Sequence, residues 1–306
     1  MKDMELHASP VAEGVRFQIG SATAFAVRKE NKDVALRLRR EFHPARDAMA
    51  RIPFLRGILR LVGGVFDFLD GVSESSQLMP QQIVRGSRFE QRFAELFRIR
   101  PTSLVAAGSG LAVLFLVVGL VGAGPWALER FLLPRLDLEL PRTAINAAAC
   151  VLRVLMGLIC VLLVPRLRLI SRFCMYRGAI NQVLNAAGAQ GGAVSQAQAE
   201  KADWLTGRND AAFWVETLLI GMIAVSAVRT CTLPVQLVVR LFTLLAVAAV
   251  INEPLRLLER APSRGAVRVL TAFHRWLERR LVRRPHVQMT EVAVYAYNAA
   301  RENRKP

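Results

Sequence analysis

The sequence predicts a mainly α-helical membrane protein with about four transmembrane helices, a small N-terminal β-hairpin and cytoplasmic amphipathic helices. Hydropathy is the first observation behind this prediction. The chain of 306 residues is 53% hydrophobic, yet its formal net charge is +17. Soluble proteins this basic, most of which bind nucleic acid, are rarely so apolar. Four apolar stretches match or approach the about 20 residues that a membrane-spanning helix needs. They cover residues 103–124, 144–164, 211–228 and 233–251.

The distribution of positive charge is the second observation. Of the 41 lysines and arginines, 35 lie in the alternate segments 1–102, 165–210 and 252–306. Cytoplasmic loops of membrane proteins carry such an excess of Lys and Arg. We therefore expect a multi-pass membrane protein with both termini in the cytoplasm. It divides into a cytoplasmic N-terminal region (1–102), a transmembrane region (103–252) with the cytoplasmic loop 165–210, and a basic cytoplasmic C-terminal region (253–306).

Three elements are expected before the first span. Residues 11–28 read as a β-hairpin, because apolar residues alternate along 15–19 and Gly20-Ser21 supplies a two-residue turn. Pro53 opens an amphipathic helix to about residue 70, which either lies in the membrane interface or packs in the cytoplasmic domain. A helix over 87–100 combines three phenylalanines on one face with four arginines, a fifth arginine lies just before it at Arg85, and we expect it to contact anionic lipid. The first 30 residues have no apolar core, so no cleavable signal peptide is expected.

The C-terminal half is expected to contain both loops and helices. Residues 186–199, rich in Ala, Gly and Gln, indicate a mobile loop. Pro254 is expected to bend or end the fourth helix. Two basic helices follow over about 264–283 and 290–303, with Thr290 as a candidate N-cap. A charge run beside a membrane is typical of a lipid or topology signal, so we do not expect these helices to bind nucleic acid.

Three charged residues lie within the apolar stretches: Arg153, Glu216 and Arg240. An arginine at the centre of a span costs roughly 2.5–3.5 kcal/mol, so each needs a partner or an aqueous cavity. The structural interpretation, a buried clamp or a side chain that reaches the interface, is favoured over a transport path or a lipid head-group site. Glu216 lies near the cytoplasmic end and Arg240 nearer the outside, so a direct pair between them is not expected.

The sequence lacks the local motifs of catalysis and of metal binding. The four histidines and four cysteines show no metal-ligand spacing, and no C-x-x-C is present. Phosphate loops, dinucleotide fingerprints and nucleophile elbows are also missing from the sequence. We therefore assign no catalytic, cofactor-binding or metal-ligating residue, and we expect the cysteines to be reduced.

Six short motifs stand in a characteristic order along the chain. They are Glu13-Gly14-Val15 with Ala24–Arg28, Pro53-Phe-Leu-Arg-Gly57, Arg153 in the second span, Tyr176–Ala186 after it, Asn252-Glu253, and Glu291-Val-Ala293. Their order and placement against the spans resemble the YqhQ-like bacterial membrane proteins, a domain of unknown function once described as a predicted metal-dependent enzyme. The resemblance covers nearly the whole chain and implies a location in the bacterial plasma membrane.

The chain departs from this family where metal ligands would stand. The motif after the second span resembles Y-H-G-A-E-H-K-x-x-N-A, and the chain keeps Tyr176, Gly178, Ala179, Asn185 and Ala186. Its other positions hold Arg177, Ile180, Asn181 and Gln182. The motif before the third span resembles H-P-R-C-G-T, and here only Arg208 is kept, while Asp210 stands in place of glycine. Imidazole, carboxylate and thiolate bind transition metals, so the resemblance implies a degenerate metal site.

Three functional hypotheses follow. The first is a non-catalytic scaffold or partner-binding subunit, forming a homo-oligomer or a hetero-oligomer with related chains. The second is a membrane-embedded enzyme whose cytoplasmic site joins residues 176–186 to 204–212. The third is an oligomeric channel or transporter that uses Arg153 and Arg240.

Overall fold

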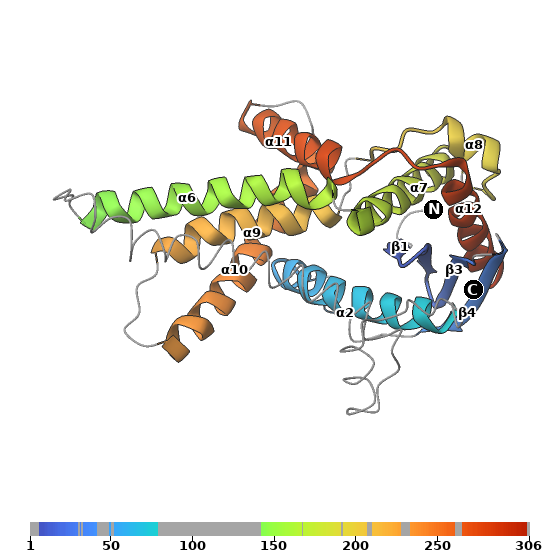
Figure 1. Cartoon of the computed structure of the whole chain (residues 1–306), viewed down its shortest axis with the longest axis horizontal. Helices are drawn as coiled ribbons and strands as arrows, with labels where there is room; N and C mark the ends of the chain where they lie inside the picture. The colour runs from blue at the N-terminus through green and yellow to red at the C-terminus, as the bar shows by residue number, and fades with distance from the viewer. Residues whose placement is uncertain are drawn as a thin grey trace.

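The computed structural model describes two regions, an N-terminal sheet with its helices and a group of apolar helices (Figure 1). The described residues are 6–29, 31, 33–41, 49, 52–78, 142–166, 168–190, 192–206, 210–227, 233–260 and 265–304. The helix expected over 87–100 and the first span, 103–124, lie outside them. The protein is mainly helical, with an antiparallel sheet near its N-terminus.

Four antiparallel strands form this sheet in the order β1-β2-β3-β4. Their bounds are Leu6–Val11 (β1), Gly14–Ile19 (β2), Ala22–Arg28 (β3) and Val34–Arg40 (β4). The β2–β3 pair confirms the expected hairpin, since Ile19 pairs with Ala22 across the Gly20-Ser21 turn. The sequence prediction missed the two outer strands.

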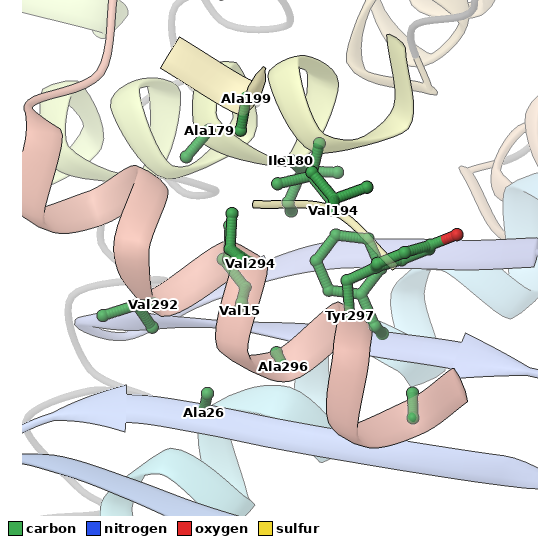
Figure 2. Packing of buried hydrophobic residues seen from close by; sticks show 14 of the residues in the cluster. Val15, Ala26, Ala179, Ile180, Val194, Ala199, Val292, Val294, Ala296 and Tyr297 are labelled. Atoms are coloured by element: carbon green, nitrogen blue, oxygen red, sulfur yellow. The ribbon is translucent and has the colours of Figure 1, made fainter. Parts of the chain in front are cut away.

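Helices α7 (Arg168–Gln190) and α12 (Val287–Glu302) form the main hydrophobic core with one face of the sheet (Figure 2). Alternation along β2 sends Val15, Phe17 and Ile19 into this core. The ring of Phe17 meets Tyr297 of α12 edge to face, with 5.7 Å between centroids. The same alternation sends Arg16 to the opposite face.

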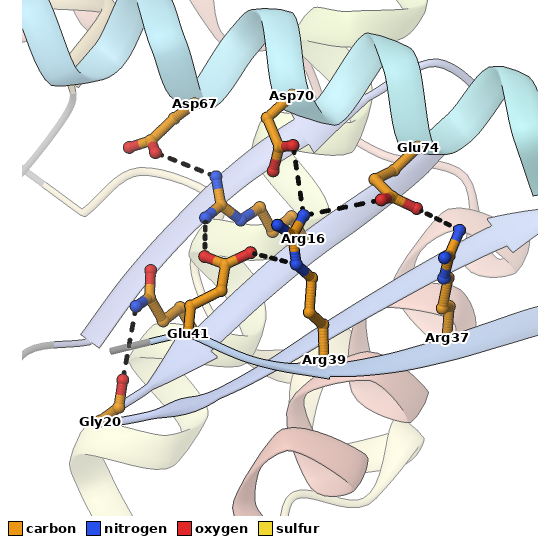
Figure 3. Close-up of polar contacts among 9 residues, drawn as sticks. Arg16, Gly20, Arg37, Arg39, Glu41, Asp67, Asp70 and Glu74 are labelled. Carbon is orange, nitrogen blue, oxygen red and sulfur yellow. Dashed lines mark hydrogen bonds and ion pairs between the residues drawn. The ribbon is translucent and has the colours of Figure 1, made fainter. Parts of the chain in front are cut away.

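Helix α2 (Leu55–Leu78) lies along that opposite face and is held by ion pairs (Figure 3). Buried Arg16 donates to Glu41 at 2.7 Å and to Asp67 at 3.0 Å. Arg37 of β4 donates to Glu74 at 2.6 Å. The helix expected over 53–70 is therefore present, extends to Leu78, and packs on the sheet along its C-terminal half.

The apolar helices α6 (Arg142–Leu163), α9 (Asp210–Ala227) and α10 (Leu233–Arg260) pack beside one another, with α11 (Gly265–Leu281) across their end (Figure 1). Within the described residues, Val238–Leu255 of α10 is long and apolar enough to cross a membrane, by length and composition. The apolar parts of α6 and α9, Cys150–Leu163 and Ala212–Ala224, are shorter.

Three local expectations were wrong. Residues 176–186 form the middle of α7 and not a loop, and α7 continues to Gln190 into the segment expected to be mobile. That segment then forms α8 (Gln196–Lys201), which Ser195 and Gln198 begin with a capping box. His286, not Thr290, is the N-cap of α12, because this helix begins three residues earlier than expected. Of the two alternatives for Pro254, a bend or an end of the helix, the end is excluded, because α10 continues past it to Arg260.

Candidate functional site

Three amide side chains on α7 bind the segment that leads to α9. Asn181 donates to the carbonyl of Trp204 at 2.9 Å, and Gln182 donates to that of Ala202 at 3.4 Å. Asn185 donates to the carbonyls of Asp203 and Leu205 at 2.7 and 3.0 Å. We call Asn181, Gln182 and Asn185 the amide cluster. It holds residues 202–206 along α7 by capturing backbone carbonyls that have no helix or strand partner.

The neighbours of the amide cluster are also engaged in folding contacts. Gln182 Oε1 accepts a hydrogen bond from buried Thr290 of α12 at 2.9 Å. Arg177 donates to the carbonyl of Ala8 at 2.8 Å and so ties α7 to β1. Ile180 is fully buried in the hydrophobic core. The four side chains at the positions of the expected family ligands and lysine therefore hold α7, the sheet, α12 and the 202–206 segment together.

Beyond this segment lies a buried group of carboxylates and a histidine that the sequence analysis did not bring together. Glu278 of α11 accepts a hydrogen bond from the backbone N–H of Thr206 at 2.9 Å. One helical turn earlier, His274 Nδ1 lies 2.9 Å from Oε1 of Glu216 on α9. Glu216 is 1% exposed and His274 7%. Glu216 thus has a partner other than Arg240, and no local spacing signals a pair 58 residues apart.

A second group of motif residues joins the hairpin to α7 and α12. Glu13, at φ 55°, forms an ion pair with Arg172, and Arg28 forms one with Glu291. Burial raises the pKa of Glu13 above its usual value, although Arg172 opposes this rise. Burial and the nearby Glu13 raise the pKa of Tyr176 to about 12. These ion pairs join the β2–β3 hairpin region to α7 and α12, which are distant from it in sequence.

The remaining motif pair fastens α2 to α10. Arg56 donates to both carboxylate oxygens of Glu253, and the backbone N–H of Phe54 donates to Glu253 Oε1 at 3.1 Å. Arg60 donates to Asn252 at 3.2 Å and lies over the ring of Phe213, 4.4 Å from its centroid. A bidentate arginine–carboxylate pair fixes orientation as well as distance.

Three motif glycines lie where another backbone passes closely. A Cβ at Gly14 would lie 2.1 Å from the carbonyl oxygen of Ala26, one at Gly57 2.3 Å from that of Ala248, and one at Gly178 2.2 Å from that of Arg283. No side chain fits at such distances. These glycines are therefore explained by packing.

The other predicted positions are placed as follows. Ala179 is buried in the core, Arg153 is half-buried on α6 and has an interaction partner, and Arg240 is exposed on α10. Arg208 and the side chain of Asp210 lie outside the described part of the chain. Within that part, no three His, Cys, Asp or Glu side chains are placed to hold a metal ion.

Comparison with known families gives one match. The model of a family of proteins of unknown function, DUF1385, matches residues 52–303. The chain belongs to this family. The match runs from the start of α2 to the end of α12 and includes the amide cluster, the Arg56–Glu253 pair and the Glu216–His274 pair. No curated protein and no solved structure matches the chain.

Proposed function

We propose that this member of DUF1385 is a four-span membrane protein whose cytoplasmic part acts as a non-catalytic scaffold or partner-binding subunit. One observation carries the proposal: Arg177, Ile180, Asn181 and Gln182 are engaged in folding contacts at the positions where a YqhQ-like relative would carry metal ligands and a lysine. Neutral amides that donate to carbonyls are poor ligands for a transition metal. The fold is maintained by these contacts and by the close backbone packing at the motif glycines Gly14, Gly57 and Gly178.

Exposed apolar side chains support the membrane part of the proposal. Val151, Leu155, Ile159 and Leu163 recur every fourth residue along α6 and are all exposed. On α10, Val238, Leu241 and Phe242 are exposed in the same way. Only 28% of the candidate span Val238–Leu255 is buried, whereas the core helix of a soluble protein would be mostly buried. Lipid is the environment that accepts such faces.

The outer face of α11 supports a contact with anionic lipid at the cytoplasmic face. Its exposed charges over the turns that can be described are Arg275, Arg279 and Arg280. Arg280 lies 6.0 Å from the centroid of the half-buried Trp276 ring, and tryptophan is enriched at membrane interfaces. Each basic residue near an anionic surface contributes about 1 kcal/mol. These features support α11 as a second candidate for contact with anionic lipid, beside the helix expected over residues 87–100.

Metal analysis and assembly state test the scaffold. The full chain, purified in mild detergent, is expected to hold no stoichiometric zinc, iron or manganese and to form a homo-oligomer or a complex with related chains. Stoichiometric metal that is lost in Asp210→Asn would contradict the proposal. So would a monomer that captures no related chain after cross-linking in membranes.

The runner-up is a membrane-embedded enzyme with a cytoplasmic site near 176–186 and 204–212. Direct hydrogen bonds from Asn181 and Asn185 to residues 203–205 favour it, because such a site requires these segments to be adjacent. Metal bound through Asp210 would select this alternative. The channel alternative gains less support, since Arg240 is exposed beside Leu241 and Phe242 on α10.

A further inference from the structure

The Glu216–His274 pair connects two helices of opposite character. Between Ala211 and Ala227, Glu216 is the sole charged residue in the sequence of the apolar helix α9. His274 lies on the buried face of basic α11, between Phe273 and Leu277, which pack against Ala212 of α9 and Val161 of α6. A carboxylate and an imidazole this deeply buried cost free energy unless hydrogen bonds or an opposite charge compensate for the lost hydration.

Two polar atoms of this pair have no hydrogen-bond partner in the part of the chain that the structure describes. They are Oε2 of Glu216 and Nε2 of His274. An unpaired buried polar group costs about 1–3 kcal/mol, and native proteins contain few of them. Two such atoms on one hydrogen-bonded pair indicate a site at which a further hydrogen-bonding group or a proton can bind.

The protons held by Glu216 and His274 point to a further proton as the ligand of this site. When Nδ1 donates its hydrogen to ionised Glu216, Nε2 keeps a free lone pair and the pair carries a net charge of −1. One proton delivered by hydronium to Nε2 forms an N–H bond, releases water, and leaves an imidazolium beside a carboxylate with no net charge. Burial penalises a net charge more than a neutral pair of opposite charges.

We propose that Glu216 and His274 form a proton-binding site, and that the bound proton strengthens the docking of α11 on α9. The inference goes beyond the scaffold function and does not depend on it. The same site can transmit its state, because Glu278 on the next turn of α11 holds Thr206 at the end of the segment bound by the amide cluster.

Charged residues of both signs lie on α11 and on the helices packed against it. Glu278 lies on the same buried face of α11 and adds negative charge, while Arg275, Arg279 and Arg280 are exposed. The elements packed against α11 are α6, α9 and α10. Their other charged residues are Arg142 and Arg153 on α6, Asp210 on α9, and Arg240, Glu253, Arg256, Glu259 and Arg260 on α10.

The test uses the full chain in lipid nanodiscs with ¹⁵N-labelled histidine, which is practical because the chain has only 4 histidines. The signal absent from His274→Gln is that of His274. We expect this signal to shift on acidification, as the pair takes up the proposed proton. Hydrogen exchange in residues 265–281, after correction for the intrinsic pH dependence of amide exchange, is expected to slow on the order of tenfold over the same transition.

Matched variants decide whether the coupling belongs to this pair. Glu216→Gln keeps the side-chain shape and is expected to abolish the change in exchange. Glu200→Gln, the same substitution at an exposed carboxylate on α8, is expected to leave it intact. A His274 signal that does not titrate in the unmodified protein overturns the proposal even if Glu216→Gln fails to fold. Equal pH-dependent exchange in Glu216→Gln and Glu200→Gln overturns it too.

Discussion

Cys174 shows how burial on α7 controls the chemistry of a single side chain. Burial raises the pKa of this thiol to about 11, although Arg283 opposes the rise. Only the thiolate reacts with alkylating reagents. A rise from 9.0 to about 11 lowers the thiolate fraction at neutral pH roughly 100-fold.

We therefore expect a variant that retains only Cys174 to react with iodoacetamide at pH 8 at least about 100-fold more slowly when folded than when unfolded in urea. Timed alkylation followed by mass spectrometry measures both rates. Similar rates in the two states would show that the thiol is exposed or ionised in the folded protein.

Tyr176, two residues further on, predicts a loss of stability in alkali. Burial and Glu13 raise its pKa from 10.0 to about 12 in the folded state. A group whose folded pKa is raised contributes stability that is complete below the unfolded pKa and is lost as pH rises through the folded pKa. The free energy of unfolding should therefore fall between pH 10 and pH 12, by roughly 3 kcal/mol from this residue.

Tyr176→Phe removes this ionisation, so its unfolding free energy is expected to fall less steeply over the same pH range. Urea unfolding in detergent, followed by tryptophan fluorescence at several pH values, gives both curves. Parallel curves for the two proteins would contradict the assignment of the alkaline loss to Tyr176.

At the scale of elements, the sequence predicted the strands and helices that bury one apolar face and leave the other face polar. The β2–β3 hairpin was found because one face of β2 is apolar and Gly20-Ser21 turns the chain. Strand β4 was missed because Arg37 and Arg39 face α2, where ion pairs replace apolar contacts. The central turns of α7 were taken for a loop because they are buried on nearly every side, by amides as well as apolar residues, and show no single apolar stripe.

Two glycines of α7 provide a matched test of this packing. Gly178 lies against the backbone of Arg283, whereas a Cβ at Gly188 meets nothing within 4 Å. Alanine favours a helix over glycine by up to about 1 kcal/mol. Gly188→Ala should therefore leave stability unchanged or raise it, while Gly178→Ala should lower it by more than about 2 kcal/mol, because a backbone must move. Denaturant midpoints measure both, and equal effects would refute the close approach.

The Arg56–Glu253 pair predicts energetic coupling between α2 and α10. Both side chains are partly buried, and the carboxylate also accepts the N–H of Phe54. A double-mutant cycle with Arg56→Gln and Glu253→Gln is expected to give a coupling of about 1–2 kcal/mol, above the range for exposed pairs. Arg301→Gln combined with Glu253→Gln serves as the control, because Arg301 lies on α12, and should be additive. A coupling near zero for the first pair would show that the clamp does not stabilise the docked helix.

At the scale of the whole molecule, the site depends on contacts that no local pattern encodes. The sequence analysis identified Asn181 and Gln182 as departures from the family motif and Asn185 as a retained position, but not their carbonyl partners, because backbone acceptors have no sequence signature. Glu216 and His274 are 58 residues apart, and Arg56 and Glu253 are 197 apart. Such pairs become visible only when the helices that carry them are placed in space.

Topology is the prediction that concerns the whole chain. If four spans leave both termini in the cytoplasm, the short turn between the third and fourth apolar stretches faces outward, and it contains the native Cys231. The turn of the β2–β3 hairpin, with exposed Ser21, then faces the cytoplasm.

A variant that retains only Cys231 should react with a membrane-impermeant maleimide in intact spheroplasts. Ser21→Cys in a cysteine-free background should react only after lysis, and its full reaction then shows that the site itself is accessible. Labelling of both positions before lysis, or of neither, would exclude this topology, because an odd number of membrane crossings separates the two positions.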